Sequence, residues 1–294
     1  MKILLTGATG LLGGAILAAL TSTGEHEVRV MVRPDSPNLG RVSGLPVEVV
    51  RGDVSLAEDV ARACRSGVEA VVHVAGIEYS PQVAEGIRRA GAERLVAVSS
   101  TSAHSRFASR SGPKLEMEEV VRGSGLAWSI VRPAMIFGSE LDKNIHHLLR
   151  FLDRSPVFPV FGDGKNLWQP VYFEDCAAGV VEALRHEAAV GRAYDLPGRY
   201  PLTYESLVRT AGAALGRNPR IVRLPLEPIQ KGLAFAEGFG MPLPFGSEQV
   251  MRLREDKAYS FEPARKDLGY SPRTFEEGVE LEVERLRRAG ILGG

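Results

Sequence analysis

Residues 5–13 read LTGATGLLG, which places glycines at positions 7, 10 and 13. The short apolar run Lys2–Thr6 leads into them, and Leu11–Ser22 after them has the apolar spacing of a helix. A strand, a glycine-rich turn and a helix are therefore expected in direct succession. Glycine allows a tight turn at the first position, a close approach at the second, and close packing of helix on strand at the third.

Further along the chain, apolar strand-like runs alternate with helical stretches. The strand-like runs are Val28–Val32, Val47–Val50, Glu69–Ala75, Arg94–Ser99 and Ala127–Val131, and the helical stretches are Leu56–Cys64, Pro81–Ala90 and Pro113–Arg122. This alternation predicts βαβ units and a parallel sheet that helices cover on both faces.

The pattern loosens beyond Pro133. We expect a loop at Pro156–Gly164 and an interruption at Pro242–Gly246. Three further helices and two further strands are expected. The helices are Glu174–His186, Tyr204–Leu215 and Phe275 to about Arg288, and the strands are Arg192–Leu196 and Arg220–Leu224.

The context of the glycine turn predicts a dinucleotide-binding loop. It follows a strand and opens a helix, so a diphosphate can rest on the free N–H groups at the helix N-terminus. The alternative is a purely structural glycine-rich turn.

Arg33 favours NADP(H) over NAD(H). The second strand ends Val-Met-Val-Arg-Pro at residues 30–34, without the acidic residue that would bind a ribose 2′-hydroxyl, and a guanidinium suits a 2′-phosphate. Alternatively, Arg33 faces solvent or stacks on adenine. Asp53 and Val54 follow the third strand, where Asp53 either faces the adenine amino group or caps the next helix.

Composition excludes several classes of partner. Lys+Arg and Asp+Glu number 36 each, so nothing points to nucleic acid or an anionic membrane. No stretch approaches ~18 uninterrupted apolar residues, and no His/Cys spacing suits a metal. Met1 and Lys2 lead straight into Ile3–Leu5 without a leader, so export is not expected. The two scattered cysteines, Cys64 and Cys176, suit reduced packing residues, so we expect a cytoplasmic protein, and its expected partner is a small-molecule substrate. A homodimer is the base-rate expectation.

Several motifs in order resemble the short-chain dehydrogenase/reductase superfamily, in its extended or atypical branch. That branch includes NAD(P)-dependent sugar epimerase/dehydratases, NmrA-like proteins and isoflavone-reductase-like proteins. The motifs are Thr6–Gly13, Gly52-Asp53, His73–Gly76, Val98–Thr101, Val131–Pro133 and Val171–Asp175. The resemblance is specific up to residue 133 and diffuse afterwards.

The resemblance implies an α/β fold with a doubly wound, parallel Rossmann-type sheet and a smaller C-terminal α+β substrate lobe. We expect residues 1–138 to form the NAD(P)-binding domain, with some later segments returning to it, and residues 139–294 to form mainly the lobe. Pro133 would pack on the nicotinamide. The expected cofactor contacts are Gly7, Thr9, Gly10, Leu11, Leu12, Gly13, Arg33, Asp53, Val54, Ala75, Gly76, Ser99, Lys114 and Pro133.

The catalytic set that the resemblance implies is incomplete. Thr101, with Ser100 as a near alternative, matches the hydroxyl residue, and Lys114 matches the lysine. The tyrosine four residues before that lysine is replaced by Arg110, which cannot act as an acid/base because a guanidinium stays protonated.

Three residues are candidates to replace the tyrosine. Tyr79 follows the fourth strand and could reach the substrate, or it could be an aromatic that covers the cofactor or packs on the lobe. Lys114 could act through a water. His104 is the third candidate, although a lone loop histidine often has no catalytic role.

We therefore expect an NAD(P)H-dependent oxidoreductase that transfers a hydride to a small carbonyl, imine or activated C=C substrate. A non-catalytic NADP-binding regulator or assembly factor is the alternative, because the tyrosine is missing. A nucleotide-sugar epimerase or dehydratase is a further alternative.

Overall fold

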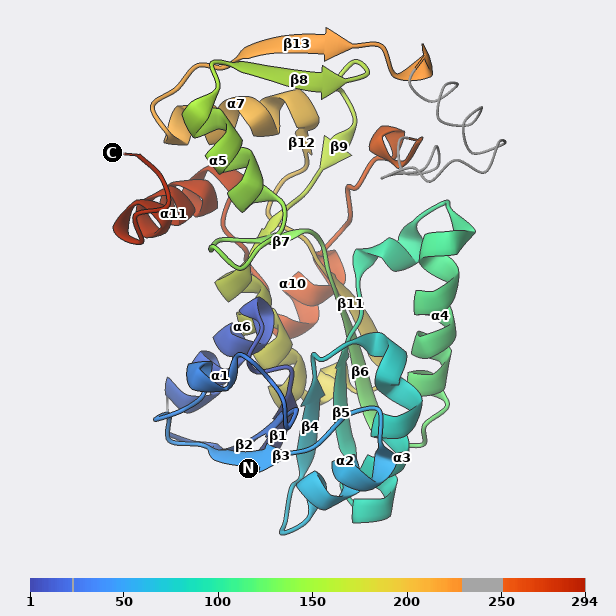
Figure 1. The fold of residues 1–294 in the computed structure, drawn as a ribbon. Coiled ribbons are helices and arrows are strands. Elements are labelled where there is room, and N and C mark those ends of the chain that lie inside the picture. Colours follow the sequence, from blue (N-terminus) through green and yellow to red (C-terminus); the bar gives the residue numbers. More distant parts are fainter. Residues whose placement is uncertain (23, 229–250, 294) are drawn as a thin grey trace, which may run out of the picture. The chain divides into compact units, whose positions relative to one another are not determined.

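A computed structural model describes residues 1–22, 24–228 and 251–293 (Figure 1). The expected interruption at Pro242–Gly246 lies outside these residues. The chain divides into two compact units, each assembled from three segments. Unit 1 comprises Met1–Ile136, Val171–Pro197 and Ser260–Pro272, and unit 2 comprises Phe137–Pro170, Gly198–Tyr259 and Arg273–Gly294.

Unit 1 is built on a seven-stranded parallel sheet in the order β11-β6-β5-β4-β1-β2-β3. This confirms the predicted α/β fold with a parallel Rossmann-type sheet. The strands are β1 Lys2–Thr6, β2 Glu27–Val32, β3 Glu48–Arg51, β4 Ala70–His73, β5 Arg94–Val98, β6 Ala127–Pro133 and β11 Arg192–Leu196.

Helices cover both faces of this sheet. Alternate strand residues enter different cores, because neighbouring side chains of a strand point to opposite faces. Ile3 and Leu5 pack with α1 and α6, whereas Leu4 packs with α2, α3 and α4. The helices of unit 1 are α1 Leu11–Ser22, α2 Ala57–Cys64, α3 Ser80–Ala90, α4 Ala108–Arg122, α6 Phe173–Arg185 and α10 Glu262–Leu268, with the short 3-10 turns η1 Leu39–Arg41, η2 Ile77–Tyr79, η3 Thr101–His104 and η4 Glu187–Ala189.

The strand order creates a switch point between β1 and β4. These strands are neighbours in the sheet, with Thr6 opposite His73, although β2 and β3 lie between them in sequence. The chain leaves β1 toward β2 on one side and leaves β4 toward β5 on the other. Ligands of open α/β sheets bind outside the carboxyl ends of the strands at such a point.

Unit 2 contains three helices and several short strands among the residues described. They are α5 Ile145–Arg154, β8 Val157–Phe161, β9 Leu167–Trp168, β12 Leu202–Thr203, α7 Tyr204–Ala214, β13 Arg220–Leu224, η5 Arg252–Arg254 and α11 Phe275–Arg288. Two further short strands, β7 Ile136–Phe137 and β10 Val171–Tyr172, pair with each other, and Ile136 and β10 belong to unit 1.

The prediction of a loop at Pro156–Gly164 was wrong for most of its length. Val157–Phe161 forms β8, which pairs in parallel with β13. Pro159 lacks an N–H and suggested a loop, but a two-stranded sheet leaves each strand one edge without a ladder, where proline is tolerated. Gly162 does begin a turn, with φ 83°.

Two helices of the structure were not predicted, and a third begins earlier in the sequence than predicted. Neither α5 nor α10 was recognised, although α5 buries Ile145, Leu149 and Leu152 at helical spacing. Helix α4 begins at Ala108 instead of residue 113, so Pro113 lies inside it. The other predicted elements agree with the structure within two residues. Over the described part of the chain, no helix is both long and apolar enough to cross a membrane.

Candidate functional site

The glycine loop between β1 and α1 is closely packed at two of its three glycines. A Cβ on Gly13 would lie 2.0 Å from the Gly7 carbonyl oxygen. Gly7 has φ 75°, and a Cβ there would lie 2.9 Å from the Ala75 nitrogen. A Cβ on Gly10 would meet only the Gly7 oxygen, at an ordinary 3.5 Å. The protein therefore requires glycine at 7 and 13 for its own packing, and the space above Gly10 stays open.

Two hollows adjoin at this loop, and all their lining residues belong to unit 1. The first, called here the lysine hollow, has a volume of about 340 Å³. The second, called here the arginine hollow, has a volume of about 400 Å³, and the two share Gly7, Gly10 and Val74. The lysine hollow is also lined by Leu11, Leu12, Gly13, Gly76, Ser99, Ser100, Lys114 and Pro133, and the arginine hollow by Thr9, Arg33, Ser36, Asn38, Asp53, Val54, Ala75 and Tyr79.

The structure brings all the predicted cofactor contacts to one or both hollows. Thr101 is different: its side chain is buried, and it lines neither hollow. Ser100 lines the lysine hollow instead, and its hydroxyl accepts a hydrogen bond from the Ser102 nitrogen at 3.2 Å. Of the two candidates for the hydroxyl residue, Ser100 and not Thr101 therefore lines the lysine hollow, beside Ser99.

In the arginine hollow, the carboxylate of Asp53 is held by its own turn. It accepts a hydrogen bond from the Ser55 nitrogen at 2.8 Å, and this bond lowers the pKa of Asp53, with the charge of Arg33 adding to the effect. Helix α2 starts later, with Leu56 as its N-cap. Asp53 therefore does not cap that helix, and its side chain belongs to the hollow that Arg33 also lines.

Arg41 is a residue of this region that the sequence analysis missed. It ends η1, and its guanidinium donates a hydrogen bond to the carbonyl oxygen of Thr9 at 2.9 Å. The contact ties the segment after β2 to the glycine loop. No motif surrounds Arg41 in the sequence, so only the fold brings it next to Thr9.

In the lysine hollow, Lys114 is the one charged side chain among the described lining residues. Its ammonium lies 3.8 Å from the Glu78 carboxylate. Arg110 is exposed one helical turn earlier on α4, at the position where the resemblance implies a tyrosine. Tyr79 lines the arginine hollow and not the lysine hollow, so it lies on the side of Arg33 and Asp53.

His104 belongs to a charged network at the carboxyl ends of β6 and β11. Its Nε2 lies 2.9 Å from the carboxylate of Asp195, and Asp195 lies 3.6 Å from the guanidinium of Arg132. Arg132 in turn bonds the fully buried Glu118 through two nitrogens, at 2.8 and 2.5 Å. Burial is the largest single influence and raises the pKa of Glu118, but the hydrogen bonds to its carboxylate and the charges of Arg132 and Arg122 together leave that pKa below its usual value.

His73 holds the carboxyl end of β4 in place. It is fully buried, with Nδ1 2.8 Å from the Thr6 hydroxyl and Nε2 2.7 Å from the Gly76 carbonyl oxygen. Burial lowers its pKa to about 4, so the ring is neutral at pH 7. In that state Nε2 donates to Gly76 and Nδ1 accepts from Thr6, which fixes the turn that lines the lysine hollow.

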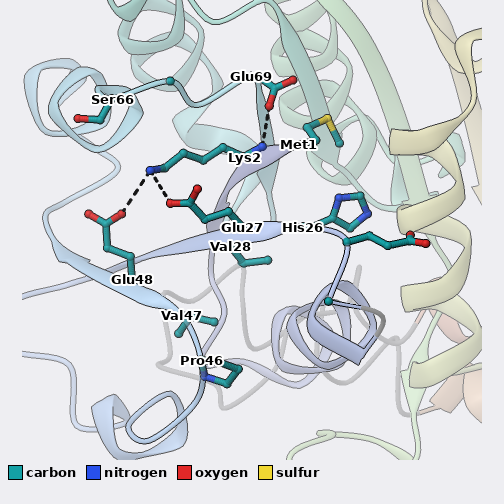
Figure 2. Close-up of a pocket in the computed structure, with 13 residues that line it drawn as sticks. Met1, Lys2, His26, Glu27, Val28, Pro46, Val47, Glu48, Ser66 and Glu69 are labelled. Atoms are coloured by element: carbon teal, nitrogen blue, oxygen red, sulfur yellow. Dashed lines mark hydrogen bonds and ion pairs between the residues drawn. The ribbon is translucent and has the colours of Figure 1, made fainter.

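A third hollow lies at the opposite edge of the sheet, around the amino ends of β1, β2 and β3 (Figure 2). Lys2 contacts three of its carboxylates, two through its ammonium and one through its backbone nitrogen. The Lys2 ammonium lies 2.6 Å from Glu27 and 3.8 Å from Glu48, and the Lys2 nitrogen donates to Glu69. Over the described residues, no group of three or more His, Cys, Asp or Glu side chains is arranged to hold a metal ion.

Comparison with known proteins agrees with this geometry. Residues 7–149 match a family described as NAD(P)H-binding. A ceramide reductase from Caulobacter vibrioides is 32% identical, over 76% of this chain and 73% of that protein. The chain belongs to the extended short-chain dehydrogenase/reductase superfamily. This confirms the resemblance seen in its motifs.

Other members of the superfamily are similar over most of the chain. A 2-alkyl-3-oxoalkanoate reductase from Stenotrophomonas maltophilia is 29% identical, over 95% of this chain and 97% of that protein. Subunit 9 of the NADH dehydrogenase 1 alpha subcomplex from Arabidopsis thaliana is 29% identical, over 86% of this chain and 68% of that protein. The fold is also that of a UDP-glucose 4-epimerase from Thermotoga maritima, with a TM-score of 0.77 at 17% identity, covering 98% of this chain and 99% of that one.

Proposed function

We propose that this protein is an NADP(H)-dependent reductase that transfers a hydride to a carbonyl, imine or activated C=C substrate. The observation that carries the proposal is the pair of hollows joined at Gly7 and Gly10, with Lys114 in one and Arg33 in the other. A dinucleotide has two nucleoside halves linked by a diphosphate, and the glycine loop offers free N–H groups at the helix start between two such cavities.

The preference for NADP(H) is supported by the charges of the arginine hollow. Arg33 directly follows β2 and is exposed, and it makes no ion pair with a carboxylate of the residues described. Arg41 stands nearby, bound to the carbonyl of Thr9. Guanidinium groups match the geometry and charge of a 2′-phosphate, whereas an NAD(H) site would place an acid at the end of β2.

Each half of the site has a distinct task in this proposal. The bound cofactor supplies the hydride. The N–H groups at the start of α1 and the open space above Gly10 receive its diphosphate. Lys114 donates hydrogen bonds to the nicotinamide ribose, and Ser100 orients the substrate oxygen. The proton that this oxygen takes up comes from solvent, because Arg110 cannot supply it.

The substrate class is proposed from the named relatives. Two reductases among them act, by name, on ceramide and on 2-alkyl-3-oxoalkanoates. We therefore expect an oxo compound that carries an alkyl chain, and a 3-oxoalkanoate is the first compound to test.

The proposal is tested by titrating the protein with NADPH and with NADH while following nicotinamide fluorescence. We expect tighter binding of NADPH, and a loss of about 10-fold or more in NADPH affinity for Arg33→Ala with NADH affinity unchanged. Oxidation of NADPH is then followed with 3-oxoalkanoates, other ketones, imines and quinones. Equal affinity for the two cofactors would reject the NADP preference, and no turnover with any compound would reject the reductase.

A second candidate function is a non-catalytic NADP-binding subunit or assembly factor. Arg110 in place of the tyrosine favours it, as does the likeness to a subunit of NADH dehydrogenase. Tight NADPH binding without turnover, together with a partner protein that co-purifies in a fixed ratio, would support this function over the reductase.

A further inference from the structure

Glu78 places a carboxylate directly beside the lysine hollow. It lies in η2, immediately after Gly76 and Ile77, which both line that hollow. Gly76 has φ 130°, and a Cβ added there would lie 2.6 Å from Glu78 Oε1. The carboxylate therefore occupies the space over the Gly76 backbone that a side chain at position 76 would fill.

The carboxylate and the ammonium of Lys114 form a donor–acceptor pair. Their nearest atoms are 3.8 Å apart, and the Glu78 side chain is 59% exposed. An exposed ion pair at this distance contributes little to stability, so a ligand can enter between the two groups at little cost. The ammonium offers only donors and the carboxylate only acceptors.

This pair matches the chemistry of a ribose cis-diol. Each hydroxyl of a diol both donates and accepts a hydrogen bond, and carboxylates bind ribose hydroxyls in nucleotide sites. None of the described residues that line the lysine hollow carries a carboxylate, and Glu78 brings one next to Lys114. We propose that Glu78 is a cofactor-binding residue that accepts hydrogen bonds from the nicotinamide ribose, with Lys114 as the donor on the same diol.

The inference rests on the proposed cofactor function and explains how the site works without a tyrosine. A phenol before the lysine would supply one hydroxyl contact to the ribose. Arg110, at that position, offers no acceptor. Glu78 supplies an acceptor from a different element, the turn after β4.

Two fragments of the cofactor separate this inference from the proposed function. Reduced nicotinamide mononucleotide is the nicotinamide half of the cofactor, with the nicotinamide ribose as its single ribose. The fragment 2′,5′-ADP is the adenosine half with its 2′-phosphate. The Kd of each is measured by calorimetry for the wild type, Glu78→Gln, Glu78→Asp and Arg33→Ala. The control is Glu85→Gln, which removes an exposed carboxylate that pairs with Arg89 on α3.

We expect Glu78→Gln to weaken the binding of reduced nicotinamide mononucleotide by about 10-fold, because one charge-assisted acceptor is lost. The affinity for 2′,5′-ADP should stay unchanged. Glu78→Asp should fall between this variant and the wild type, and Glu85→Gln should bind both fragments normally. Arg33→Ala should weaken the binding of 2′,5′-ADP and leave the affinity for the mononucleotide unchanged.

Unchanged mononucleotide affinity in Glu78→Gln would overturn the inference, as would a wild type that binds 2′,5′-ADP but not the mononucleotide. Both results would leave the proposed cofactor function standing. A wild type that binds neither fragment nor NADPH would reject the proposed function and this inference together.

Discussion

At the scale of single residues, the three glycines of the loop serve different purposes. Gly7 and Gly13 are required by the protein itself, because a Cβ on either would collide with backbone atoms. A Cβ on Gly10 would make only an ordinary van der Waals contact. The spacing of the three glycines is regular in sequence, but the reason for each differs in the fold.

We expect Gly13→Ala and Gly10→Ala to separate stability from binding. Gly13→Ala should lower the free energy of unfolding by about 2–4 kcal/mol, because backbone must move to admit the Cβ. Gly10→Ala should change the free energy of unfolding by less than about 1 kcal/mol, but it should weaken the binding of NADPH. Urea unfolding and NADPH titration of both variants check this, and equal loss of stability in the two would contradict it.

His73 makes stability depend on pH below neutrality. Its pKa is about 4 in the folded protein against 6.5 in the unfolded chain, so the unfolded chain binds the extra proton between those values. Stability therefore falls as pH drops from 6.5 toward 4, by up to about 3 kcal/mol from this group. His73→Gln should show a shallower fall in urea unfolding over that range.

The exposed His147 is the matched control for this experiment. His147→Gln should keep the wild-type pH dependence. If His73→Gln also keeps it, the buried ring is not the cause.

At the scale of elements, α4 carries both the lysine of the site and the replaced tyrosine. Arg110 and Lys114 lie one turn apart on this helix, and Arg110 is exposed, so a new side chain there meets no buried packing. We expect Arg110→Tyr to raise kcat for a ketone by about 10-fold or more, because a phenol at this position can donate the proton. Steady-state turnover measures this, with Arg110→Phe as the control without a hydroxyl. Equal turnover in the two variants would contradict the prediction.

Helix α11 of unit 2 contains a buried acid, Glu282. Glu282 is fully buried, and burial, with the charge of Asp142 adding to it, raises its pKa to about 10. The folded protein therefore holds a proton that the unfolded chain releases above about pH 4.5, and stability falls as pH rises from there.

Glu282→Gln should remove this dependence. We expect it to raise the free energy of unfolding by roughly 1–3 kcal/mol at pH 7 and to leave it nearly unchanged at pH 4. Glu280→Gln, an exposed change on the same helix, should have little effect at either pH. A Glu282→Gln variant less stable than wild type at pH 7 would show that the carboxylate is ionised and paired.

At the scale of the whole molecule, unit 1 is assembled from three separate stretches of chain. Helix α6 shares a sheet face with α1 and buries Cys176, Val180 and Leu184 there. Strand β11 pairs along the outer edge of β6. The sheet that presents the glycine loop is therefore completed by residues 171–197, far along the sequence.

A fragment of residues 1–138 should fail to fold cooperatively. It lacks α6 and β11, so it would expose the part of one apolar sheet face that α6 covers and leave β6 as a free edge. We expect broad, non-cooperative thermal unfolding and aggregation, against a sharp transition for the full chain. Calorimetry and light scattering check this, and a monomeric fragment with a sharp transition would contradict it.

Periodic patterns predicted most of the fold. Residues 2–6 and 11–22 were placed correctly because a continuous apolar run and a helical apolar spacing are local signals. Val157–Phe161 was misjudged because its proline is acceptable only at a strand edge that pairs with nothing, and its partner β13 lies about 60 residues away.

The residues themselves determined the parallel sheet, the glycine loop and the identity of the groups placed around it, because strand and helix periods and turn residues act over short distances in the chain. The tertiary structure alone decided that Ser100 and not Thr101 lines the lysine hollow and that Tyr79 lines the same hollow as Arg33. It also decided that Arg41 contacts Thr9 and that Glu78 lies beside Lys114. Each of these depends on how separate elements pack together, since a side chain's neighbours across a sheet edge are set by strand order and helix placement, which no local pattern records.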